Sequence, residues 1–70
     1  MERQDIFLLI EGERERQEKL HAKVDSELYM LAVLTEEIGE VAKAVQEGTN
    51  VVEELIQVAA VAIRWLENRP

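Results

Sequence analysis

The chain has 70 residues, of which eight are basic and fifteen acidic, for a formal net charge of −7. This balance argues against binding to nucleic acid or to an anionic membrane surface. The absence of cysteine excludes disulfides and thiolate zinc sites, and a single histidine argues against a histidine-rich metal site. Because 47% of the residues are hydrophobic, more than so small a core buries alone, we expect several copies to share one core.

No stretch of the sequence has the pattern of a targeting signal or a membrane anchor. Residues 1–5 lack the apolar segment of a signal peptide. The longest apolar run, residues 58–66, is interrupted by Arg64 and is too short to cross a membrane. We therefore expect a cytoplasmic protein with a single domain over residues 1–70 and no linker.

Sparse glycine and proline, with no sustained two-residue alternation, predict an all-α fold. The first helix is expected over residues 5–20, with its apolar side chains in the first two turns and an almost wholly polar second half. The second helix is expected to begin at Asp25 or Ser26, both good N-caps, and to end at Glu47 before Gly48.

The third helix is expected over residues 50–68, where Asn50 and Glu53 have the spacing of a capping box. Only residues 48–50 separate it from the second helix, and so short a link favours an antiparallel helical hairpin. The predicted fold class is therefore an all-α chain of three helices with a central antiparallel hairpin, which assembles into an oligomeric helical bundle.

Two glutamates of the second helix fall in or beside its apolar stripe. At about 100° per residue, four apolar residues lie within about 40° of Glu37: Met30, Val33, Val41 and Ala44. Glu40 lies about 60° to one side of Glu37. Three other charged residues fall beyond Glu40, where they can reach water: Glu36, Lys43 and Glu47.

The third helix repeats this arrangement. Three apolar residues lie within about 40° of Glu54: Val58, Val61 and Trp65. Gln57 lies about 60° to one side, and three charged residues are expected on the polar side: Glu53, Arg64 and Glu67. Each arm of the predicted hairpin therefore carries a polar pair inside an apolar face: Glu37 with Glu40, and Glu54 with Gln57.

Inward carboxylates need a partner, because a buried ionised carboxylate is costly unless it is paired, hydrogen-bonded or bound to a metal. Lys43 is expected to face away, and Arg64 to reach only Gln57 or Glu53. Oxygen ligands suit a hard cation such as Mg²⁺ or Mn²⁺, and facing helices of a bundle are a usual place for carboxylate metal sites. The alternative is that the hairpin lies at the edge of the bundle and both pairs are merely interfacial.

The same residues resemble the signature of a known family. Glu36-Glu37-Ile38-Gly39-Glu40 and, after thirteen residues, Glu54-Leu55-Ile56-Gln57 are similar to the EExxE…ExxD motif of the MazG-like all-α nucleoside triphosphate pyrophosphohydrolases. Residues 31–44 and 52–62 resemble two helices of that family, and residues 13–17 resemble its opening helix. The resemblance covers about residues 5–67.

The resemblance implies a Mg²⁺-dependent enzyme that hydrolyses ribo- or deoxynucleoside triphosphates to the monophosphate and pyrophosphate, as a house-cleaning enzyme of the nucleotide pool. The metal, for which Mn²⁺ is an alternative, would grip the triphosphate, stabilise charge and generate the nucleophile. It would also let a protein of net charge −7 bind a polyanion. Members of the family assemble as dimers or tetramers, which agrees with the oligomer expected from chain length.

Carried over by position, the metal ligands would be Glu37, Glu40, Glu54 and Gln57, with glutamine where the motif has aspartate. Glu36 and Glu37 would be the catalytic residues, with Glu36 acting as a base through water or else being a solvated side chain. Four residues would contact the substrate: Arg16, Lys19, Lys43 and Trp65. The alternative is that the three basic residues are solvated charges on the surface and that Trp65 packs in the core.

Two alternatives to a hydrolase stay open. One is a metal- or nucleotide-binding helical assembly protein without turnover, its activity impaired by Gln57 because an amide brings no charge to the site. The other is a structural, coiled-coil-like oligomer without a metal.

Overall fold

The structure, a computed structural model, describes residues 1–69. Within this range the chain forms three α-helices and no strand: α1 (Arg3–Leu20), α2 (Glu27–Glu47) and α3 (Val51–Asn68). The predicted all-α fold is confirmed, and α1 begins earlier than expected. None of the helices in this part of the chain has the length and apolarity that crossing a membrane requires.

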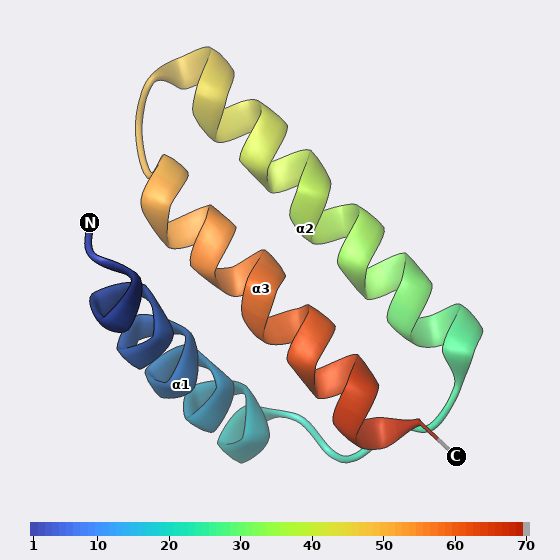
Figure 1. Ribbon diagram of the computed structural model, residues 1–70. Coiled ribbons are helices and arrows are strands. Elements are labelled where there is room, and N and C mark those ends of the chain that lie inside the picture. The colour runs from blue at the N-terminus through green and yellow to red at the C-terminus, as the bar shows by residue number, and fades with distance from the viewer. Residues whose placement is uncertain (70) are drawn as a thin grey trace.

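The third helix, α3, lies between the other two and contacts both (Figure 1). Across residues 1–69, α1 and α2 make no packing contact with each other. The chain passes from α2 to α3 through residues 48–50 and turns back, so that these two helices lie side by side (Figure 1). Its central position gives α3 buried surface toward two neighbours.

The ends of α2 follow the predicted chemistry, whereas the start of α3 does not. The Oγ atom of Ser26 accepts a hydrogen bond from the backbone N–H of Tyr29 at 3.2 Å, which caps the N-terminus of α2. Gly48 ends the helix in the left-handed conformation, with φ 74°. Asn50 is also left-handed, with φ 62°, and its side chain makes no capping hydrogen bond. The predicted capping box is therefore wrong, because an N-cap side chain acts from extended backbone.

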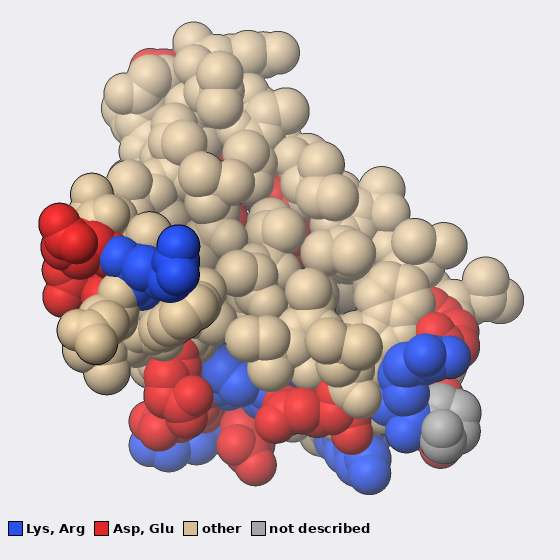
Figure 2. Space-filling model, in the orientation of Figure 1, with Lys and Arg blue, Asp and Glu red and all other residues tan. Residues whose placement is uncertain are grey.

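The buried apolar core is small. Its hydrophobic members are Met30, Ala44, Ala60 and Val61. Eight larger aliphatic side chains of α2 and α3 are exposed and make up what we call the outer apolar face: Leu28, Leu31, Ile38, Val45, Val52, Leu55, Ile63 and Leu66. Figure 2 shows the surface over α2 and α3 in this view with few charged side chains. A single chain therefore leaves much of its apolar surface uncovered.

Polar side chains take part in the packing of α1 on α3. Gln17 of α1 is buried, as are Arg64 and Asn68 of α3. The prediction that Arg64 lies on a solvated side of its helix is therefore wrong. Because α3 packs against two helices, its buried surface is wider than the single stripe used for that prediction. An ion pair between Arg14 of α1 and Glu67 of α3 further joins these two helices.

Candidate functional site

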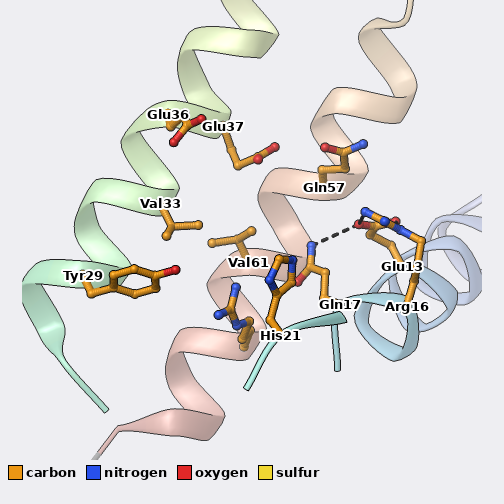
Figure 3. A pocket seen from close by; sticks show the side chains of 11 residues that line it. Glu13, Arg16, Gln17, His21, Tyr29, Val33, Glu36, Glu37, Gln57 and Val61 are labelled. Atoms are coloured by element: carbon orange, nitrogen blue, oxygen red, sulfur yellow. Dashed lines mark hydrogen bonds and ion pairs between the residues drawn. The ribbon is translucent and has the colours of Figure 1, made fainter. Parts of the chain in front are cut away.

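A cavity of about 240 Å³ bordered by all three helices is the candidate site, which we call the inter-helix cavity (Figure 3). In its polar lining, α2 contributes Glu36, Glu37 and Tyr29, and α3 contributes Gln57 and Arg64. Helix α1 and the residue that follows it contribute Glu13, Arg16, Gln17 and His21. Val33 and Val61 form an apolar part of the wall between α2 and α3. The motif acids Glu36 and Glu37 and the motif amide Gln57 therefore share one cavity.

Glu37 is a partly buried acid on the wall of this cavity, and its carboxylate points from α2 toward Gln57 of α3 (Figure 3). Its Oε2 atom is buried and has no hydrogen-bond partner among residues 1–69. Burial raises the pKa of Glu37, and repulsion from four other acids raises it further: Glu54, Glu36, Glu40 and Glu13. A carboxylate placed in this way favours a proton or a bound cation.

The four predicted metal ligands are divided between two hollows. Gln57 borders the inter-helix cavity with Glu37, whereas Glu40 and Glu54 border a smaller hollow of about 160 Å³ next to residues 48–50. Glu40 is exposed and Glu54 is partly buried. Glu37 nevertheless lies close enough to both of these acids for their charge to raise its pKa.

The donor set fits a hard cation in its chemistry, since it offers carboxylate and amide oxygens and one of these oxygens is buried without a partner. In the stretch from residue 1 to residue 69, no three carboxylate or imidazole groups lie together as a ready metal cluster. Mutual repulsion disfavours such a cluster while the carboxylates are ionised and carry no cation.

A polar network on α1 completes the cavity. The Nε and Nη2 atoms of Arg16 donate to the two carboxylate oxygens of Glu13 at 2.8 and 2.7 Å. Gln17 Nε2 donates to the same carboxylate at 3.1 Å, while Gln17 Oε1 is buried without a partner within the described range. The hydrogen bonds from Arg16 are the main reason that the pKa of Glu13 is lowered. Arg16, predicted to bind substrate, thus borders the cavity with its guanidinium held by Glu13.

The other three predicted substrate contacts lie elsewhere. Lys19 is exposed on α1, and Lys43 borders the smaller hollow. Trp65 borders a separate hollow near the end of α3, where its Nε1 donates to Glu27 Oε2 at 2.6 Å. Arg69 Nε donates to the other oxygen of Glu27 at 2.9 Å, so this cluster links the end of α3 to the start of α2. The substrate-binding roles of these three residues stay predictions.

The sequence interpretation missed the contribution of α1 to the site. Four residues of α1 recur at steps of three or four and are buried or partly buried: Ile6, Ile10, Glu13 and Gln17. This spacing indicates a buried stripe along α1. The stripe is hard to recognise in the sequence, because its first two residues are apolar and its last two are polar. Arg64 carried no comparable signal, because it stands beside apolar residues on a helix expected to have a single buried stripe.

Compared with protein-family models, with curated proteins and with solved structures, the chain has no match in any of the three. The family resemblance therefore rests on the motif residues of the chain itself.

Proposed function

We propose that the chain is a small MazG-like nucleoside triphosphate pyrophosphohydrolase. It would convert ribo- or deoxynucleoside triphosphates to the monophosphate and pyrophosphate with Mg²⁺ or Mn²⁺, as a cytoplasmic house-cleaning enzyme of the nucleotide pool. The observation that carries the proposal is the placement of Glu37, a motif acid whose buried oxygen lacks a partner among residues 1–69 and which points toward the motif residue Gln57 (Figure 3). A glutamate on a merely solvated helix face has no such environment.

The chain's own residues suit distinct tasks in this chemistry. Four would hold the metal: Glu37, Glu40, Glu54 and Gln57. When bound, the cation supplies positive charge to phosphate oxygens and lowers the pKa of a water molecule. Glu36 borders the inter-helix cavity and is exposed. Its carboxylate is therefore available to accept a proton from water in the cavity.

We further propose that α2 and α3 act as an antiparallel hairpin whose outer apolar face packs on a second copy of the chain, in a dimer or tetramer. Leu31, Ile38 and Val45 recur every seven residues along α2, as in helices that pack side by side. Each of them is at least half exposed in the single chain. Exposed apolar side chains that share one side of a helix are typical of protein–protein contacts.

The direct test is release of pyrophosphate from a panel of nucleoside triphosphates and deoxynucleoside triphosphates with Mg²⁺ or Mn²⁺. We expect release from at least one of them, and none when EDTA replaces the metal. Circular dichroism and light scattering verify that the protein assayed is folded and of defined mass. No release from any triphosphate by such a preparation would reject the enzymatic proposal.

The second candidate, an assembly protein that binds metal or nucleotide without turnover, is favoured by Gln57, which stands in the cavity where the motif has aspartate. The variant Gln57→Asp adds a charged ligand, and metal sites gain affinity with ligand charge. We expect its Mg²⁺ affinity, measured by calorimetric titration, to rise at least about 10-fold.

Turnover by Gln57→Asp separates the two candidates. A hydrolase is expected to release pyrophosphate already with Gln57, whereas an impaired relative would acquire release only in the variant. Gln46→Glu is the control, because it adds the same charge at an exposed position of α2. Unchanged Mg²⁺ affinity in Gln57→Asp would show that residue 57 is not a ligand.

A further inference from the structure

Arg64 is a charged residue of the inter-helix cavity that has no ion-pair or hydrogen-bond partner among residues 1–69. It is 4% exposed and borders the cavity from α3. Among residues 1–69 the ion pairs are Arg14 with Glu67, Arg16 with Glu13 and Arg69 with Glu27, and Arg64 belongs to none of them. Its side chain also makes no hydrogen bond within this range. The nitrogen atoms of Arg64 are not among the fully buried, unpartnered atoms of this range, so they reach the cavity and can donate to a ligand that supplies an acceptor.

The other charged groups of the cavity do not neutralise Arg64. Glu13 is taken by Arg16 and Gln17. Glu37 forms no ion pair or hydrogen bond within the described range, so it does not neutralise Arg64 either. Glu36 is exposed, and His21 adds a titratable ring but no negative charge. None of the acids that border the cavity is therefore paired with Arg64 within the described range.

The size of the cavity restricts what can enter it. Its volume of about 240 Å³ is several times the roughly 30 Å³ share of one water molecule, yet below the roughly 300–1,000 Å³ of sites for drug-sized ligands. A diphosphate group is compatible with this space, whereas a whole nucleotide exceeds it. Arginine is well suited to such a group, since its planar fork can donate two parallel hydrogen bonds to phosphate oxygens.

We propose that Arg64 is the phosphate-binding residue of the inter-helix cavity, and that the cavity receives the diphosphate portion of the substrate while the nucleoside stays outside. This inference rests on the proposed function and deepens it. It assigns to α3 the phosphate contacts that the sequence had suggested for Arg16, Lys19 and Lys43. It also gives the acidic chain a positively charged side chain that contacts the part of the substrate that leaves as pyrophosphate.

The test is calorimetric binding of inorganic pyrophosphate, with and without Mg²⁺, to the wild-type protein and to Arg64→Met. Methionine retains an unbranched side chain but removes the charge and the donors. We expect it to weaken pyrophosphate binding at least about 10-fold, the effect of losing a hydrogen bond to a charged group. Arg3→Met, the same substitution at an exposed position of α1, should leave binding unchanged. If Arg64→Met does not fold, Arg64→Lys, which keeps the charge without the fork, should weaken binding in the same direction.

Two results would overturn the inference: absence of pyrophosphate binding by the wild-type protein, or equal binding by Arg64→Met. The second would indicate a structural role, such as donation to the unpartnered oxygen of Gln17. Failure of the proposed function can be distinguished from failure of the phosphate site. Loss of pyrophosphate binding in Arg64→Met combined with no triphosphate hydrolysis by the wild-type protein would reject the enzyme and retain the phosphate site. Hydrolysis with unaffected binding would reject only the site.

Discussion

Glu37→Gln is expected to abolish pyrophosphate release and, at the same time, to raise the melting temperature of the metal-free protein. Activity should fall at least about 100-fold, because even residues that only support metal ligands cost 10- to 100-fold when replaced. The gain in stability follows from the environment of the carboxylate, whose pKa is raised first by burial and then by neighbouring acids. The amide keeps the shape of the side chain and removes the charge that these surroundings disfavour.

The raised pKa of Glu37 also determines how the difference in stability between Glu37→Gln and the wild-type protein depends on pH. A carboxyl group whose pKa is raised by folding binds its proton more tightly in the native state, so its contribution to stability is lost as the pH rises. The advantage of glutamine should therefore be full at pH values above the raised pKa of Glu37. It should disappear as the pH falls below the ordinary value of 4.5, where both states of the wild-type protein are protonated.

Thermal melting of both proteins in EDTA and in Mg²⁺ tests this expectation together with the activity assay. Mg²⁺ should raise the melting temperature of the wild-type protein, since a ligand bound only by the native state stabilises it, and should leave Glu37→Gln unmoved. Glu18→Gln provides the control, as the same substitution at an exposed position of α1. Undiminished pyrophosphate release by Glu37→Gln, or a lower melting temperature in EDTA, would contradict the role given to this residue.

Ile38→Asp is expected to convert the proposed oligomer into monomers. Ile38 is 54% exposed and lies midway between Leu31 and Val45 on the outer apolar face. A charge buried at the middle of an interface between copies has no partner there and is costly, so assembly should be strongly weakened. The side chain is already largely in water in the single chain, and the helical structure of the chain itself should therefore persist.

Sedimentation or light scattering gives the mass of each species, and circular dichroism reports the helix content. Lys23→Ala serves as the control, because it changes the net charge by the same amount in the exposed connection between α1 and α2. A wild-type protein that is already monomeric, or an Ile38→Asp variant of unchanged mass, would show that this face does not join copies of the chain.

The parts of the fold that local chemistry controls could be predicted from the sequence. The cap at Ser26 and the glycine at position 48 delimit α2 as expected, because both act within a single helical turn. Asn50 could not be assigned in this way. Its backbone conformation is imposed by the short connection between two helices, and a residue in the left-handed region cannot act as the predicted cap.

The candidate site could be predicted only where it depends on a single helix. The phase of Glu37 within α2 gave its partial burial correctly, whereas Glu40, at the margin of the same stripe, is exposed. The burial of Arg64 and the contribution of Gln17 depend on α1 packing against α3. The spacing in α1 indicates which of its side chains are buried, but it does not identify α3, a distant part of the chain, as the helix against which they pack.

The position of α3 has a consequence for how the chain acquires its structure during synthesis. The 18-residue α1 and the 21-residue α2 are synthesised before α3, and across residues 1–69 they do not pack on each other. Isolated helices of about this length are only marginally stable in water. Both therefore wait for residues 51–68, which follow them in the chain, before either gains a packing partner among the three helices. Docking of α3 should then order all three helices together in one cooperative step.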